Sequence, residues 1–180
     1  DDVDIANLRT ANDLSAAAYL ALLQGLHDCK TEQDASALLE YGINSRSHFG
    51  VSFPSIVAAG KNAAVLHYTR NNDLLPPNSL LLTDFGVRWH AMHADVTRVA
   101  PVSGHYTPLQ RLLIEITLEG QRAVETAAKP GVSIKELNDV CWETIRAALD
   151  TQLIARGGTV DLPYKVGPHN VSHLRDHEVG

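Results

Sequence analysis

Residues 80–98 read LLLTDFGVRWHAMHADVTR, and this stretch decides how the middle of the chain folds. Three leucines and a threonine lead to Asp84, which is the pattern of a buried strand that ends in a carboxylate. A second strand is expected to include Asp95 and to reach Val99. A hairpin centred near Trp89 and His90 would place Asp84 and Asp95 directly opposite each other, with their side chains about 5 Å apart.

Two carboxylates at that distance repel each other, and one pKa rises unless a cation lies between them. A metal ion, or a metal pair, shared by Asp84 and Asp95 is therefore one interpretation of the spacing. The alternative is structural, with Asp84 capping the turn before Gly86 and Asp95 paired with Arg98. The spacing alone favours the structural alternative and leaves the metal open.

Nine histidines are the one unusual feature of the composition. His169, His173 and His177 share one face whether the tail is helical or extended. Converging imidazoles suit metal ligation or proton transfer, and surface histidines near a terminus are the plain alternative.

His67 ends an apolar run at residues 64–68, where a histidine is more often a satisfied core residue than a functional one. His90 and His93 fall in the expected hairpin turn and are predicted to be solvated.

Helical periodicity predicts helices over residues 8–23, 35–41, 112–128 and 134–153. Capping signals mark three of their starts, at Thr31, Thr107 and Ser133, and Gly42 is the expected end of the second helix. Strand-like runs at residues 55–58 and 64–68 precede the hairpin. Helices that flank a central antiparallel sheet make an α+β fold. Because no linker divides it, residues 1–180 are predicted to form a single domain.

The composition excludes several classes of protein. Hydrophobic residues make up 44% and charged residues 20%, which is typical of a globular chain. A net charge of −6 argues against nucleic-acid binding and a polybasic membrane anchor, and no apolar run approaches the length of a membrane helix. The acidic start, Asp1–Asp4, is unlike a secretory leader, and two cysteines form no disulfide framework. A reducing compartment is expected, the cytoplasm first and the mitochondrion as the alternative.

Taken in chain order, the motifs resemble the pita-bread metallopeptidases, and within them the aminopeptidase P and prolidase branch. The two aspartates eleven residues apart, followed by Thr97 and Arg98, are the most specific part of the resemblance. Each motif alone is weak, and the ordered set is strong because it covers nearly the whole chain. The matching segments are Leu8–Asn12, Ile56–Tyr68, Leu82–Gly86, Asp95–Arg98, Pro101–Gly104 and Pro168–His173.

The resemblance implies a central antiparallel sheet flanked by helices and a metal-dependent exopeptidase that removes the residue before a proline. By family position the metal ligands are Asp84, Asp95 and His173, and the catalytic or substrate-binding histidines are His67, His169 and His177. Two divalent ions, Mn²⁺ first and Co²⁺, Zn²⁺ or Fe²⁺ as alternatives, would activate a bridging hydroxide for attack on the scissile carbonyl. The expected substrate is a peptide with proline at its second position. A homodimer is the expected alternative to a monomer.

Departures from the family pattern keep other readings open. The family carries two further glutamate ligands after its histidine motif, and neither is present in the chain, so it resembles a catalytic domain truncated at its C-terminal end. The interval between His173 and His177 is also shorter than usual, and Val99 stands where threonine is usual. The alternatives are an inactive pita-bread domain that binds a peptide or protein, a prolidase, or a methionine aminopeptidase.

Overall fold

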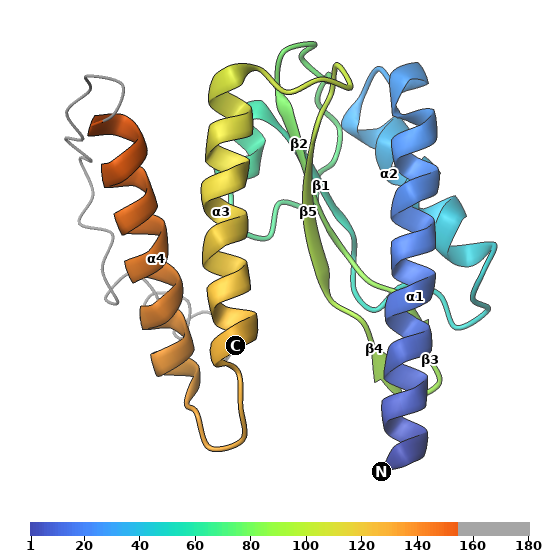
Figure 1. The fold of residues 1–180 in the computed structure, drawn as a ribbon. Coiled ribbons are helices and arrows are strands. Elements are labelled where there is room, and N and C mark those ends of the chain that lie inside the picture. Colours follow the sequence, from blue (N-terminus) through green and yellow to red (C-terminus); the bar gives the residue numbers. More distant parts are fainter. Residues whose placement is uncertain (155–180) are drawn as a thin grey trace. The chain divides into compact units, whose positions relative to one another are not determined.

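A computed structural model describes residues 1–154, which fall into two compact units that divide after Thr107. The first unit contains helices α1 and α2, a three-stranded sheet and a two-stranded sheet. Within the described residues, the second unit consists of helices α3 and α4 (Figure 1). The sheet with its flanking helices confirms the α+β prediction.

Helices α1 (Asp2–Gly25) and α2 (Glu32–Asn44) flank the short 3-10 helix η1 (Leu26–Asp28). Helix α1 begins six residues before the predicted start, because the Asp1 side chain accepts hydrogen bonds from the first free amides. Helix α2 begins after the predicted cap at Thr31, and the structure adds the reciprocal bond from Asp34 that completes a capping box.

The predicted end of α2 at Gly42 is wrong. Gly42 is buried where α2 passes α1, and an added Cβ would lie 3.3 Å from the Ala18 Cα. The glycine marks a close helix crossing, and helix α2 continues past it to Asn44.

The larger sheet has the order β1-β2-β5, with every pair antiparallel, and consists of β1 (Ile56–Ala59), β2 (Leu80–Phe85) and β5 (Val96–Pro101). Strands β3 (Arg88–Trp89) and β4 (Met92–His93) form the smaller sheet at the tip of the β2–β5 hairpin. Both strands of the predicted hairpin are therefore present, but β5 begins at Val96, so the prediction that the second strand includes Asp95 is wrong by one residue.

The two faces of the larger sheet have different surroundings. Along β2, the side chains of Leu81, Thr83 and Phe85 are buried, and the intervening ones are half-buried. Helices α1 and α2 cover the first face (Figure 1). The core on that face consists of Ala18, Leu22, Leu26, Ala35, Leu39, Ile43, Val57, Ala59, Leu75, Leu81, Phe85 and Val87. A smaller cluster of Ile56, Ala58 and Tyr68 lies on the second face, with Ala63 and Leu82 packed against it.

The strand predicted at residues 64–68 is wrong. Residues Gly60–Ala64 form the 3-10 helix η2, and the chain then turns at His67, whose φ of 52° lies in the left-handed region. Tyr68 is buried there, and its hydroxyl donates to the Glu32 carboxylate. That long-range contact overrides the local preference of the apolar run for an extended backbone.

In the second unit, α3 (Pro108–Ala127) and α4 (Ile134–Ile154) form a helical hairpin (Figure 1). Both starts confirm the sequence prediction, and Ser133 and Glu136 exchange the hydrogen bonds of a capping box. Gly120 lets the helices approach closely, since an added Cβ would lie 2.8 Å from Ile145 Cγ1. Of the helices in residues 1–154, none is long and apolar enough to span a membrane.

Candidate active site

Asp84 lies on the second face of the sheet and lines a pocket of about 310 Å³. Its neighbours in register are Ile56 on β1 and Thr97 on β5, and both side chains line the same pocket. Thr97 Oγ1 donates a hydrogen bond of 2.8 Å to Asp84 Oδ1. This bond fixes the orientation of the carboxylate and leaves its second oxygen for another partner.

The predicted pairing of Asp84 with Asp95 is wrong by two positions, because Asp84 lies opposite Thr97. The hairpin turns at His90 and Ala91, one residue later than predicted, with Trp89 paired to Met92 and His90 at a φ of 52°. When the turn of a hairpin moves by one residue, the residue that lies opposite a given position changes by two, here from Asp95 to Thr97. Side chains alternate along extended backbone, so Asp95, one residue before β5, still falls on the same side as Thr97 and Asp84, with which its carboxyl group interacts.

Gly86 brings the segment of Asp95 close to the end of β2. An added Cβ at Gly86 would lie 1.7 Å from the Ala94 carbonyl oxygen, a distance that no side chain permits. The Ala94 amide also donates to the Val87 carbonyl at 3.1 Å, which holds the two backbones together. Only glycine therefore allows Asp95 to approach Asp84 diagonally across the hairpin.

The two carboxyl groups interact directly. Desolvation of the Asp95 carboxyl group, then the negative charge of Asp84 and a hydrogen bond to it, raise the pKa of Asp95 above its usual value. Within residues 1–154 no ion pair involves either aspartate. Arg98 donates to the Thr97 carbonyl, so the structural alternative of an Asp95–Arg98 pair is absent from the described part of the chain.

These oxygens fit a divalent cation. Two adjacent carboxylates with no cationic partner in residues 1–154 offer the hard oxygen ligands that Mn²⁺ and Mg²⁺ prefer, and bound charge would relieve their repulsion. The described residues contain no group of three His, Cys, Asp or Glu side chains that could hold a metal. The predicted third ligand, His173, lies outside the described residues, as do His169 and His177.

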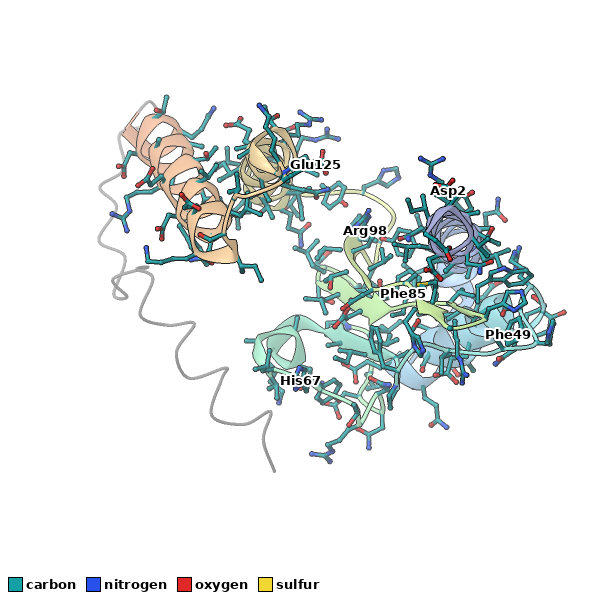
Figure 2. The ribbon with its side chains drawn as sticks, turned by 90° about the horizontal axis from the view of Figure 1, so that it is seen from below. Asp2, Phe49, His67, Phe85, Arg98 and Glu125 are labelled. Atoms are coloured by element: carbon teal, nitrogen blue, oxygen red, sulfur yellow. The ribbon has the colours of Figure 1, made fainter. Side chains whose placement is uncertain are left out.

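His67 lines the same pocket as Asp84, together with the preceding residues Ala63–Leu66. Its side chain is exposed, so His67 is not the buried core histidine that the sequence analysis considered as an alternative. In Figure 2, His67 lies beside η2 and apart from Phe85. His90 and His93 are exposed at the hairpin tip, as predicted.

Sequence reasoning named Thr97 and Gly86 as parts of motifs and assigned neither of them a role in the site. Thr97 follows Asp95 at the spacing that places side chains on one face of a strand, and this spacing was the available signal. Gly86 stands at the Asp84 end of the hairpin, where an isolated glycine in a strand pattern indicates a close backbone approach.

Comparison with known families shows where the chain belongs. Residues 6–179 match Peptidase_M24, metallopeptidase family M24. The chain is a member of metallopeptidase family M24. The match spans both described units and includes Asp84, Asp95 and His67, which agrees with the resemblance to pita-bread metallopeptidases.

Two of the curated relatives that the chain matches carry the name "Probable Xaa-Pro aminopeptidase". The protein from Ajellomyces capsulatus (strain H143) is 30% identical over 190 residues, which cover 99% of this chain and 36% of that protein. The protein from Coccidioides posadasii (strain C735), named with the suffix PEPP, is 32% identical over 193 residues and is covered to 41%. The chain thus spans about two fifths of the length of these two relatives.

Solved structures show the same fold. X-Pro aminopeptidase from Thermotoga maritima superposes with a TM-score of 0.76 at 31% identity, covering 82% of this chain and 42% of that one. The Glu383Ala variant of Escherichia coli aminopeptidase P in complex with substrate gives a TM-score of 0.78 at 25% identity, covering 98% and 38%. This M24 chain therefore has the pita-bread fold of aminopeptidase P, as the sequence predicted.

Proposed function

We propose that this chain supplies part of the metal site and of the substrate site of an Xaa-Pro aminopeptidase. The observation that carries the proposal is that Asp95 lies next to Asp84, and that Asp84 and His67 line the same pocket. Membership of family M24 and the names of the relatives support the reaction class. The cytoplasmic location and the homodimer stay predictions from the sequence.

The proposed cofactor is a pair of divalent ions, with Mn²⁺ preferred for an oxygen-rich site. Asp84 and Asp95 would hold them, and His173 is the predicted third protein ligand from this chain. When bound, such ions supply a water of lowered pKa and polarise the scissile carbonyl. Thr97 contributes by holding Asp84 through the hydrogen bond to Oδ1, as outer-shell partners of metal ligands do.

The pocket wall supports an apolar substrate group beside the carboxylates. Ile56, Leu82, Val65 and Leu66 line it, and together they offer the apolar surface that a proline ring can bury. His67 lies in the same wall, where its imidazole can donate a hydrogen bond to a peptide carbonyl. This chain would therefore orient the substrate through His67 and bind its ring through the apolar wall.

The test is peptide cleavage by the full-length natural protein that carries this sequence. It is assayed with an Xaa-Pro-Xaa peptide, with the same peptide carrying alanine for proline, and with Mn²⁺ or a chelator added. We expect release of the N-terminal residue from the proline peptide alone and loss of release with the chelator. Equal cleavage of the two peptides, or cleavage that survives the chelator, contradicts the proposal.

A further inference from the structure

Glu32 is a fully buried carboxylate that the proposed chemistry does not use. It lies in the first turn of α2 and forms no ion pair within residues 1–154. A buried charge without a cation is costly unless hydrogen bonds satisfy both oxygens. Its retention in the interior therefore points to a specific arrangement of donors around it.

Four donors surround the Glu32 carboxylate, and all of them come from one segment, residues 59–73. The Ala59 amide and Asn62 Nδ2 donate to Oε1 at 2.8 and 3.0 Å. The Tyr68 hydroxyl and the Asp73 amide donate to Oε2 at 2.7 and 3.0 Å. Burial alone would raise the pKa of Glu32, but these bonds outweigh it and hold the pKa below its usual value.

The same segment carries His67. Tyr68 is 8% exposed, with its ring in the cluster of Ile56 and Ala58 and its hydroxyl fixed by Glu32. His67, the preceding residue, adopts a φ of 52°, a conformation that persists only where the surroundings enforce it. Tyr68 is held inward, and the adjacent His67 side chain is exposed and lines the Asp84 pocket.

Further contacts within the segment, and one to β1, support the same turn. Asn62 Nδ2 also lies 3.0 Å from the Tyr68 hydroxyl and 2.9 Å from Asp73 Oδ2. Asn71 accepts from the Val57 amide at 2.9 Å, which ties the end of the segment to the free edge of β1. The turn is thus fixed at both ends, and among residues 1–154 Glu32 is the one group outside the segment that bonds to its start, its middle and its end.

We propose that Glu32 is a positioning residue, whose buried carboxylate holds the turn of residues 60–73 so that His67 lies at the Asp84 pocket. The inference rests on the proposed function, because it assigns Glu32 a role in placing the substrate histidine. Glu32 would act through Tyr68 and His67 and would not touch the metals.

The experiment compares Glu32→Gln with His67→Ala, with both combined, and with Ser15→Ala in the full-length natural protein. In Glu32→Gln, an NH₂ group replaces one of the two acceptor oxygens and faces the donors of residues 59–73. The substitution therefore weakens the hold on the turn, while the volume of the side chain stays nearly the same. Ser15 is the matched control, since it is also fully buried. Its Oγ accepts a hydrogen bond of 2.9 Å from the Val87 amide, and this bond does not involve residues 60–73. Tyr68→Phe is a milder variant that removes a single bond to Glu32 and keeps the ring.

We expect Glu32→Gln and His67→Ala each to lower kcat/KM for an Xaa-Pro-Xaa peptide by about 10-fold or more, with metal content unchanged. In the His67→Ala background, Glu32→Gln should lower kcat/KM no further, because Glu32 acts through the residue already removed. Tyr68→Phe should have a smaller effect of the same sign, and Ser15→Ala should leave kcat/KM unchanged. Additive losses, or equal losses in Glu32→Gln and Ser15→Ala, overturn the inference.

Amide hydrogen exchange gives a readout that does not depend on turnover. Glu32→Gln should speed exchange in residues 60–74 selectively, and Ser15→Ala should not. If the wild-type protein cleaves no Xaa-Pro peptide, the proposed function fails, and exchange still decides whether Glu32 holds the turn. Unchanged exchange in residues 60–74 of Glu32→Gln overturns the positioning role whatever the activity.

Discussion

The two faces of the β1-β2-β5 sheet use the same strands for opposite tasks. Leu81, Thr83 and Phe85 point from β2 into the core beneath α1 and α2, and Leu82 and Asp84 point from the same strand into the pocket. The first face stabilises the fold through buried apolar surface. The second holds two carboxylates that repel each other. The period of two along a strand lets one element do both, because neither set of side chains contacts the other.

The core face should dominate stability, and Phe85→Ala tests this with the largest expected effect. Phe85 is 0% exposed and stacks on Tyr19 with ring centroids 5.8 Å apart, so its loss should cost about 3–5 kcal/mol of unfolding free energy. Urea unfolding of wild type and variant measures this loss of unfolding free energy. Leu82→Ala on the pocket face is the control and should cost less than about 2 kcal/mol. Equal costs for both would break the distinction between the faces.

The pocket face should dominate function, and Asp84→Asn and Asp95→Asn test this. Each should abolish stoichiometric metal binding and lower turnover more than about 100-fold, equivalent to about 2.7 kcal/mol. Metal analysis and peptide cleavage measure the two effects. Unfolding free energy of the metal-free protein should stay the same or rise, because the repulsion between the carboxylates is removed.

The exposed pair of His27 and Asp28 supplies the matched control, since Asp28→Asn makes the same chemical change far from the pocket. Metal content and turnover should be unchanged in that variant. Normal metal stoichiometry in both Asp84→Asn and Asp95→Asn would remove the basis for the metal site.

Gly86 connects the two faces, and Gly86→Ala should disturb both at an intermediate level. The added Cβ meets the Ala94 carbonyl, so the hairpin must open, at a cost of about 1–3 kcal/mol in unfolding free energy. Displacement of Asp95 should also weaken metal binding, measured by titration. In Gly104→Ala, with a φ of 78° and open space around the glycine, backbone strain should cost about 1–2 kcal/mol and metal affinity should stay normal. Equal metal affinity in the two variants would contradict the role of Gly86.

The smallest expected effect is the pH dependence that Glu32 contributes to stability. Its folded pKa lies below the usual 4.5, so its stabilising contribution is present above that pH and is lost as the pH falls through the folded pKa. Urea unfolding of wild type and Glu32→Gln should show a gap in free energy that narrows below pH 4.5. A gap that stays constant from pH 6 to pH 3 would contradict the lowered pKa.

Local patterns predicted the elements that local physics controls. The capping boxes at Thr31 and Ser133 and the start at Pro108 lie where the sequence predicts them, because each depends on residues a few positions apart. The apolar run before Asp84 likewise predicted β2 and the carboxylate at its end. The prediction of a single domain over residues 1–180 remains a prediction, and residues 1–154 form two compact units.

The sequence named residues of the candidate site, but it did not give their geometry correctly. Asp84, Asp95 and His67 were all named, yet the direct pairing of the aspartates was wrong because His90 and Ala91 carry none of the usual turn residues that fix a hairpin. The predicted face of Asp95 is nevertheless correct, because side chains two positions apart along a strand point to the same face. The roles of His169, His173 and His177 stay predictions.

The sequence by itself determined the strands β1, β2 and β5 to within a residue or two, the starts of α2, α3 and α4, the spacing of the two aspartates and the membership of a metallopeptidase family. These follow from short-range patterns and ordered motifs. Only the tertiary structure decided the turn at His67, the closeness of Asp95 to Asp84 and the burial of Glu32. Each of these depends on groups far apart in sequence, such as Glu32 and Tyr68, or Gly86 and Ala94. Hydrogen bonding and steric exclusion act through space, so no local pattern carries them.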